Sequence, residues 1–221
     1  MGCGSVDDDN RAFPRQSDSP MTSSTVPANL TPAMLTVADA QREMRYAYYE
    51  GAPGMLISGL VWAVAAFVAL RVSPERAIWT LFIGGMLIHP GAVLLRRLLG
   101  RRGTHLPTNP LGVLALATTF WMILCLPLAY AASRLHIEWF FPAMLFVIGG
   151  RYLTFSTLFG LRIYWACGGA LVVAGYLLGR GLVAPVGAAL AGALIEIIFA
   201  GIIFATARGA VEAAPQAVQR G

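Results

Sequence analysis

The sequence contains no lysine, and charged residues of any kind are scarce, at 12% of its 221 residues. A soluble domain carries about 25% charged residues. Hydrophobic residues instead make up 57% of the chain, and they gather in long blocks without a 3.6-residue or two-residue alternation. Blocks of that kind cannot all be buried in one small core. We therefore expect them to face lipid, which excludes a soluble globular domain.

The sequence also lacks the residue patterns of catalytic and metal centres. It has no GxSxG, HExxH or P-loop motif, and no GxGxxG in a strand–helix context. No aspartate follows Asp39, which excludes a pair of intramembrane aspartates. The three cysteines are far apart and show neither metal-ligand nor disulfide spacing. The sequence thus gives no support for an enzyme, and we expect no metal ion and no cofactor.

Arginine carries the basic charge of the chain, whose formal net charge is +5. A basic chain raises the question of nucleic-acid binding. The arginines, however, lie in short loops between the apolar blocks, where they suit topology signals and anionic lipid headgroups better. We therefore expect no nucleic-acid partner. The cluster that we expect to contact lipid headgroups consists of Arg96, Arg97, Arg101 and Arg102.

The pattern predicts an all-α protein, a polytopic transmembrane helical bundle of about six helices. Residues 1–36 are rich in Asp, Ser, Thr, Pro and Asn, which is typical of a disordered tail. Residues 37–50 mix tyrosines with charged side chains, as in a short interfacial helix that leads into the membrane. Residues 210–221 are expected to form a flexible C-terminal tail.

The transmembrane domain is expected to span residues 37–209. After the interfacial helix it contains six apolar blocks, each near the ~20 residues that cross ~30 Å of hydrocarbon. Short breaks that contain Pro, Gly or Arg separate the blocks and stop the helices. The blocks are 52–70, 77–95, 110–132, 137–158, 163–178 and 183–206.

The arginines are unevenly distributed over the two ends of the blocks. More of them flank the block ends that lie on the same side of the membrane as the N-terminus, mainly because of the cluster from Arg96 to Arg102. The positive-inside rule then places both termini in the cytoplasm, and an even number of helices agrees with this. The expected location is the inner (plasma) membrane of the cell, with the lipid bilayer as the main partner.

Polar residues within the apolar blocks are the candidates for a binding site, because a charge at the bilayer centre costs about 2.5–3.5 kcal/mol on insertion scales. His89, Arg151 and Glu196 lie about 9, 12 and 15 Å from the cytoplasmic ends of their blocks. Glu50 and Asn109 lie at the cytoplasmic starts of the first and third blocks. We expect these five residues to line a polar cavity open to the cytoplasm, with an Arg151–Glu196 ion pair.

A purely structural interpretation of each buried group stays open beside this one. Arg151 is long enough to extend to the headgroups over this distance. His89 precedes Pro90 and can bind carbonyl groups that the proline leaves free. Glu196 can be protonated or hydrogen-bonded to a neighbouring helix. It is too short to reach the headgroups, so it favours a functional role most strongly.

Three short motifs resemble an uncharacterised family of small bacterial multi-pass membrane proteins. Gly51–Pro53, with Trp62 nine positions after the proline, is similar to the first helix of that family, and Asn109–Gly112 to the start of its third. Glu196 in the last block also fits. The resemblance covers roughly Gln41–Arg208. It implies a helical membrane protein of unknown function and no activity.

Three functions agree with these features, in decreasing order of support. The first is a small-solute or proton-coupled transporter that uses the cytoplasm-facing polar cluster. The second is a structural or regulatory partner of another membrane protein, or a homo-oligomer, because small residues that allow close helix packing are frequent, with 24 glycines. The third is a lipid-modifying enzyme whose Arg96–Arg102 loop binds phosphate headgroups.

Overall fold

The computed structural model of the 221-residue chain is helical throughout the part that it describes. It describes residues 36–100, 105 and 107–218, with side chains placed as far as Ala207. The tail expected over residues 1–36 therefore lies outside the described residues, except for Thr36. The elements are α1 (Val37–Tyr48), η1 (Tyr49–Gly51), α2 (Ala52–Arg71), α3 (Pro74–Leu98), α4 (Leu111–Leu135), η2 (Ile137–Trp139), α5 (Phe140–Phe159), α6 (Ile163–Arg180) and α7 (Pro185–Val218).

The helices α2 to α7 are long and apolar enough to cross a membrane. At 1.5 Å per residue, the 20 residues of α2 span about 30 Å, the thickness of the hydrocarbon core. The predicted fold class is thereby confirmed: the chain is an all-α membrane protein with six such helices, and their apolar outer faces contact lipid.

Local signals set the ends of these helices. Ser73 caps α3 by accepting a hydrogen bond from the Arg76 amide over 3.2 Å, and Pro74 takes the first helical position. This cap starts the helix three residues before the apolar block at residue 77. At the other end of the chain, α7 stays helical to Val218, beyond residue 210 where a tail is expected. Residues 209–218 are rich in alanine, which has the highest helix propensity.

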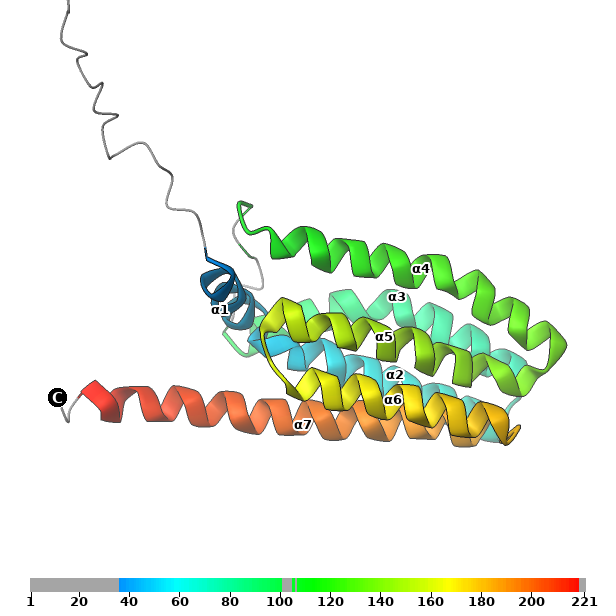
Figure 1. The fold of residues 1–221 in the computed structure, drawn as a ribbon. Helices are drawn as coiled ribbons and strands as arrows, with labels where there is room; N and C mark the ends of the chain where they lie inside the picture. Colours follow the sequence, from blue (N-terminus) through cyan, green and yellow to red (C-terminus); the bar gives the residue numbers. More distant parts are fainter. Residues whose placement is uncertain (1–35, 101–104, 106, 219–221) are drawn as a thin grey trace, which may run out of the picture. The chain divides into compact units, whose positions relative to one another are not determined.

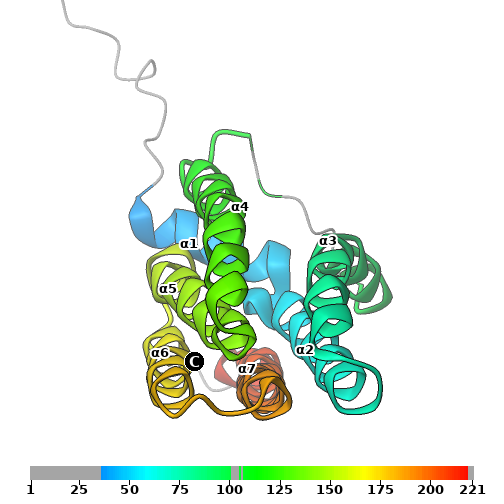
Figure 2. The same cartoon turned by 90° about the vertical axis from the view of Figure 1, so that its right-hand side faces the viewer.

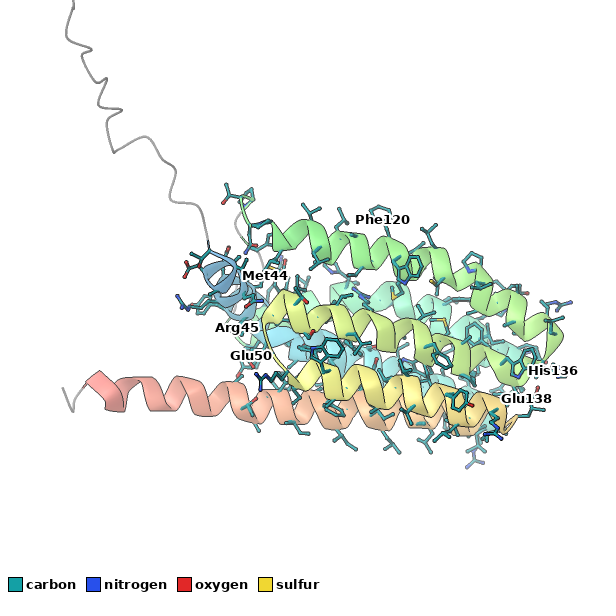
Figure 3. All side chains as sticks on the ribbon, in the orientation of Figure 1. Met44, Arg45, Glu50, Phe120, His136 and Glu138 are labelled. Carbon is teal, nitrogen blue, oxygen red and sulfur yellow. The ribbon has the colours of Figure 1, made fainter. Side chains whose placement is uncertain are left out.

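The six long helices run antiparallel to their chain neighbours, and α1 lies across one end of the bundle (Figures 1 and 2). The helix α2 packs along α7 and α3, while α5 packs along α6 and α4. Figure 3 shows Arg45 and Glu50 at the α1 end, and His136 and Glu138 at the opposite end. The core lies between α2, α5, α6 and α7. By contrast, α4 buries only Thr118 and Ala129.

Glycines allow a close helix contact between α5 and α6. A Cβ atom added at Gly168 would lie 2.7 Å from the carbonyl oxygen of Gly149, and one at Gly149 would lie 2.9 Å from the carbonyl oxygen of Gly168. Their neighbours Gly150 and Gly169 face open space. The two glycines therefore let the backbones of α5 and α6 approach each other, with the side chains of Leu153, Leu171 and Val172 packed around them, as in the small-residue interfaces of membrane helices.

We expect Gly168→Ala to destabilise the protein by about 1–3 kcal/mol, because the new methyl group must push two backbones apart. The adjacent substitution Gly169→Ala is the matched control, since its methyl group meets no atom within 4 Å. Alanine also favours the helix by about 1 kcal/mol over glycine, so the control should be neutral or stabilising. Thermal unfolding in detergent, followed by tryptophan fluorescence, measures both. Equal midpoints for the two variants would contradict the close α5–α6 contact.

Candidate functional site

Among the acidic side chains that the structure describes, that of Glu196 is the most deeply buried. It lies on α7, midway along the membrane span Pro185–Ala207, at a depth of about 16 Å from either end. Its residue is 0% exposed. The Tyr152 hydroxyl on α5 donates a hydrogen bond of 3.1 Å to Oε1, whereas Oε2 has no hydrogen-bond partner among the described atoms. A buried acid with one free oxygen therefore lies near the middle of the membrane.

Two further polar side chains face this carboxyl group, a third lies beside Tyr152, and all three are buried. Ser58 on α2 faces it, as does Cys167 on α6. The ring of Tyr164, also on α6, lies 5.9 Å from the ring of Tyr152. We name this set the Glu196 cluster: Ser58, Tyr152, Tyr164, Cys167 and Glu196. Four helices contribute to it, so its polar groups are enclosed on all sides by the core.

A glycine on α2 makes room for this arrangement. A Cβ atom at Gly59 would lie 3.2 Å from the Cβ of Glu196 and 2.8 Å from the Ile197 side chain. The close approach of α2 and α7 brings Ser58 to the carboxyl group and removes water from it. An isolated carboxylate buried without water is costly, whereas a protonated carboxyl can both donate and accept a hydrogen bond. The cluster is thus suited to hold a proton.

Arg151 does not form the expected ion pair with Glu196. Its guanidinium group instead donates to the Met122 sulfur over 3.2 Å and to the Thr119 hydroxyl over 3.1 Å, both on α4. It also lies 5.3 Å from the centre of the Phe155 ring. Among the described side chains, no carboxylate lies within ion-pair distance of this guanidinium.

Helix geometry explains why the ion pair is absent. Arg151 and Tyr152 are consecutive on α5 and so project about 100° apart around the helix. The Tyr152 side chain points towards α6 and α7, and the Arg151 side chain points towards α4. Arg151 and Glu196 still influence each other electrostatically at longer range. The guanidinium group is held against α4 by its two hydrogen bonds to that helix.

His89 is separate from the cluster. It lies on α3 in an exposed position, and no hydrogen bond to it is found in the described part of the chain. Its depth along the helix is similar to that of Arg151, but the face it occupies is different. The structure therefore does not unite the five predicted residues in one cavity, because depth alone does not fix the direction of a side chain.

Glu50 lies in a turn of unusual backbone conformation between α1 and α2. Tyr49, Glu50 and Gly51 have φ angles of 51°, 56° and 86°, in the left-handed region. The Tyr164 hydroxyl donates a 2.6 Å hydrogen bond to the Glu50 carbonyl oxygen, which ties this turn to the Glu196 cluster. Glu50 itself lies at the α1 end of the bundle (Figure 3).

Asn109 connects α4 to α1 and is almost completely buried. Its amide nitrogen donates to the Ala40 carbonyl oxygen over 3.1 Å and to the Glu43 carboxylate over 2.7 Å. Its side-chain oxygen accepts from the Leu111 amide over 2.9 Å, at the start of α4. Each polar atom of the side chain thus has a protein partner. This geometry assigns Asn109 a tethering role between the two helices.

The arginine cluster predicted to bind headgroups is only partly described. Arg96 is buried on α3, with its guanidinium carbon 4.8 Å from the centre of the Tyr48 ring on α1. It lies against protein, which disagrees with the expected headgroup contact for this residue. Arg97 is exposed and free to reach lipid phosphates. Arg101 and Arg102 lie outside the described residues.

The hydroxyl and thiol groups of the Glu196 cluster were not predicted from the sequence. Tyr152 and Ser58 lie within apolar blocks, where a polar side chain is a signal by itself, but such residues also occur at ordinary helix contacts. For Cys167, the sequence shows only that it has neither metal-ligand nor disulfide spacing to the other cysteines. Within the described residues, no group of three His, Cys, Asp or Glu side chains is placed to hold a metal ion.

Comparison with known proteins gives one match. The model of a family described as a family of unknown function, DUF7010, matches residues 37–206. This region begins at α1 and ends one residue before the end of the last membrane span, so it contains the whole Glu196 cluster. No curated protein and no solved structure matches the chain.

Proposed function

The chain belongs to the DUF7010 family, whose function is unknown, and we propose that it is a proton-coupled carrier of a small solute. In this proposal the Glu196 carboxyl group binds and releases the coupled proton. The observation that supports it most directly is the free Oε2 atom of a completely buried acid near the bilayer centre. Ionisable residues at this depth are rare and costly, and they characterise ion and proton pathways.

The surroundings of Glu196 support a change of protonation better than a fixed charge. Tyr152 donates to one oxygen, and no guanidinium or imidazole pairs with the carboxylate among the described side chains. The anion therefore depends on one hydroxyl group, the nearby Ser58 and the distant charge of Arg151. A proton supplied from one side of the membrane removes the cost of this charge.

The helix α1 supports alternating access to this site. It covers one end of the bundle through hydrogen bonds from Gln41 to the Thr157 carbonyl oxygen and from Arg45 to the Phe159 carbonyl oxygen. The left-handed turn at Tyr49–Gly51 joins it to α2 and, through Glu50, to Tyr164. A movement of α1 about this turn would uncover the end of α5 and disturb the cluster, because a single hydrogen bond links the two.

The α1 end is proposed to face the cytoplasm, with both termini on that side of the inner membrane. Arg42, Arg45, Arg97 and Arg162 flank the helices at this end and are at least partly exposed. The outward basic residues of the opposite end are Arg71, Arg76, Arg134 and Arg180. In the sequence, Arg101 and Arg102 belong to the segment that connects α3 to α4, and the excess that the positive-inside rule requires depends on them.

We expect proteoliposomes with the full chain to accumulate at least one solute under an inward proton gradient. The probe is the low-molecular-mass fraction of a cell extract, and mass spectrometry of the lumen identifies what has entered. Glu196→Gln preserves the size and a hydrogen-bond acceptor for Tyr152 but cannot exchange a proton. It should abolish accumulation above the external concentration, because the gradient no longer drives uptake.

Empty liposomes and Glu196→Gln liposomes without a gradient serve as controls for leakage. Equal uptake of all solutes by the wild type and Glu196→Gln under the gradient would contradict the proposed role of Glu196. No protein-dependent uptake of any solute would contradict the carrier function itself.

A second function, as a subunit of a membrane complex, is favoured by the outer faces of α3 and α4. Leu116, Phe120 and Leu124 on α4 are more than half exposed, and so are Ile83 and Leu87 on α3. Either lipid or the helices of a partner protein can cover such faces. Purification in a mild detergent, followed by cross-linking in intact membranes, distinguishes the two by the presence of a second polypeptide.

A further inference from the structure

We infer that the lipid-facing side of α4, α5 and α6 binds one molecule of an anionic phospholipid, with its phosphate at Arg180 and one acyl chain in each of two adjoining grooves. The inference does not depend on the carrier function proposed above, because it uses the shape and charge of this surface alone. Three features support it: the two grooves join, an exposed arginine lines one of them, and the longer groove is as deep as one leaflet of the bilayer.

The first feature is a pair of apolar grooves on either side of α5, which packs between α4 and α6 (Figure 2). The α4–α5 groove has a volume of about 460 Å³, and the α5–α6 groove has a volume of about 390 Å³. The two grooves join, because Ala132, Trp139, Ala143 and Phe146 line both of them. Two acyl chains that leave one glycerol group can therefore lie side by side, one in each groove.

Both grooves are open towards the bilayer. Leu135, which lines the α4–α5 groove, is 74% exposed, and Tyr176, which lines the α5–α6 groove, is 56% exposed. Gly175 and Gly179 bring α6 close to α5 here, since a Cβ atom added at them would lie 2.9 Å from the Pro142 carbonyl oxygen and 3.1 Å from the Pro142 Cβ. An acyl chain can therefore enter each groove sideways from the membrane.

The second feature is the position of Arg180, the last residue of α6. It lines the α5–α6 groove, is exposed, and forms no hydrogen bond or ion pair with the described part of the chain. Trp139 and Tyr176 line the same groove, and such side chains are typical of the headgroup level of a membrane. A guanidinium group binds phosphate through two parallel hydrogen bonds. The free charge thus lies where the phosphate of a lipid in the grooves would be.

Two neighbouring features would oppose an anion at Arg180, and neither is placed to do so. The last carbonyl groups of a helix carry partial negative charge. At the end of α6, however, they accept hydrogen bonds from the amides of Gly181, Leu182 and Val183 over 3.1, 3.4 and 3.2 Å. Glu138 precedes Trp139 on η2, but it lines neither groove. An approaching headgroup therefore meets the charge of Arg180 first.

The third feature is the depth of the α4–α5 groove. On α4 its lining residues run from Leu135, the last residue of the helix, to Cys125, which lies about 15 Å away along the axis. On the other wall they run from Trp139 to Val147, over about 12 Å. Half of the hydrocarbon core of a bilayer is also about 15 Å thick. An acyl chain whose glycerol group lies beside Trp139 therefore reaches the middle of the membrane within the groove.

The charge of the site favours a headgroup that carries no cation. Of the described residues that line the grooves, Arg180 alone is charged. A choline group would therefore find no carboxylate in the grooves and would be repelled by the guanidinium group. Phosphatidylglycerol has the phosphate without a cation, so it suits the site better than phosphatidylcholine.

Native mass spectrometry of the full chain in detergent tests this inference with an equimolar mixture of phosphatidylglycerol and phosphatidylcholine that have the same acyl chains. We expect one bound lipid per chain, with phosphatidylglycerol preferred. Arg180→Gln should lower the affinity for phosphatidylglycerol about fivefold and remove the preference. Arg76→Gln is the matched control, since Arg76 is exposed at the same end of the bundle but lines neither groove, and it should bind as the wild type does.

A second substitution tests the grooves independently of the charge. Ala143 lines both grooves, so Ala143→Phe should fill their junction and abolish lipid binding while Arg180 stays intact. Ala205→Phe, at an exposed position on α7 that lines neither groove, should bind as the wild type does. If size-exclusion chromatography shows that Ala143→Phe does not fold, dihexanoyl-phosphatidylglycerol replaces it. Its chains are too short to fill the grooves, so the wild type should bind it at least about tenfold more weakly than the dipalmitoyl lipid.

Several outcomes would overturn the inference. Equal binding of the two lipids by the wild type, or an equal loss in Arg76→Gln and Arg180→Gln, would show that Arg180 does not select the headgroup. Wild-type binding by Ala143→Phe, or equal affinity for the short-chain lipid, would show that the chains do not occupy the grooves. A dimer that excludes lipid would assign the grooves to a second copy of the chain. Glycerol phosphate that binds as tightly as the lipid would assign Arg180 to a free phosphate compound.

Discussion

Glu196→Lys is expected to prevent the protein from reaching its folded state. The substitution places an ammonium group at a position that is 0% exposed, near the middle of the membrane span. The nearest charge is the guanidinium of Arg151, which repels it, and the Tyr152 hydroxyl would lose its acceptor. A buried charge without a partner costs about 3–5 kcal/mol, which lowers the folding equilibrium constant by roughly two to four orders of magnitude and removes much of the usual stability of a protein.

Fluorescence-detected size-exclusion chromatography of a fusion to a fluorescent protein measures this effect in detergent extracts. We expect the symmetrical peak of the wild type to be replaced by aggregate at the void volume. Glu196→Gln and Glu196→Met are the controls, since the first keeps an acceptor for Tyr152 and the second is apolar and of similar size. Both should keep the peak, because neither buries a charge.

The comparison of the three variants separates two explanations. If Glu196→Lys elutes as the wild type does, the carboxyl group is not enclosed by α2, α5, α6 and α7, and the proposed proton site fails. If Glu196→Met also aggregates, the hydrogen bond to Tyr152 contributes more to folding than its expected 0.5–1.5 kcal/mol. If both controls keep the peak and Glu196→Lys does not, the result agrees with a carboxyl group that is buried in its protonated, uncharged form.

The number and type of the helices could be predicted from the sequence, because a bilayer imposes a simple rule on it. Each membrane span needs about 20 apolar residues, and short polar breaks with Pro, Gly or Arg interrupt them. The observed helix ends differ from the predicted ones where a capping residue sets the start of a helix, as at Ser73. They also differ where alanine-rich sequence continues a helix, as after residue 208.

The orientation of each helix about its own axis could not be predicted in the same way. A helix that is apolar on all sides shows no stripe that marks its inner face. The structure turns Tyr152 inward and Arg151 towards α4, although the two residues are adjacent. The predicted Arg151–Glu196 ion pair was wrong for this reason. The prediction rested on the depth of each residue along its helix and had no information on the direction in which its side chain points.

Glu196 was the exception, because its chemistry restricts its direction. A short acid at this depth cannot reach the headgroups, so the protein must enclose it. The sequence therefore predicts its burial but not its partner, since the Tyr152 hydroxyl comes from a helix that is 44 residues away along the chain. Asn109 shows the same limit: its tether to Ala40 and Glu43 joins residues more than 60 positions apart.

Gly51→Ala is expected to be the most destabilising of the conservative glycine substitutions, at about 2–5 kcal/mol. Gly51 has a φ angle of 86°, a conformation that costs an alanine roughly 1–2 kcal/mol. Its new Cβ atom would also overlap the Tyr164 hydroxyl and lie 3.0 Å from the Phe159 ring, and such overpacking adds about 1–3 kcal/mol. The turn between α1 and α2 and the bond from Tyr164 to the Glu50 carbonyl oxygen should both be lost.

Gly54→Ala is the matched control for this substitution. Gly54 lies three residues further along the chain, in the first turn of α2, and its new methyl group would meet the Ala92 Cβ at an ordinary distance of 4.0 Å. Alanine also favours a helix over glycine. We therefore expect the Gly54→Ala midpoint in thermal unfolding to equal or exceed that of the wild type.

A double substitution divides the effect of Gly51→Ala into its two causes. Tyr164→Phe removes the hydroxyl that the Cβ atom would overlap, whereas the Phe159 ring remains in contact with it. Measured against Tyr164→Phe alone, Gly51→Ala should therefore cost less than in the wild type, but still at least the backbone cost of about 1–2 kcal/mol. Full recovery would mean that residue 51 is not left-handed, and no recovery would mean that Tyr164 does not contact the turn. Partial recovery would show that the Tyr49–Gly51 turn between α1 and α2 contacts Tyr164. The Tyr164 ring lies 5.9 Å from the ring of Tyr152, whose hydroxyl donates to Glu196, so the turn is connected to the Glu196 cluster.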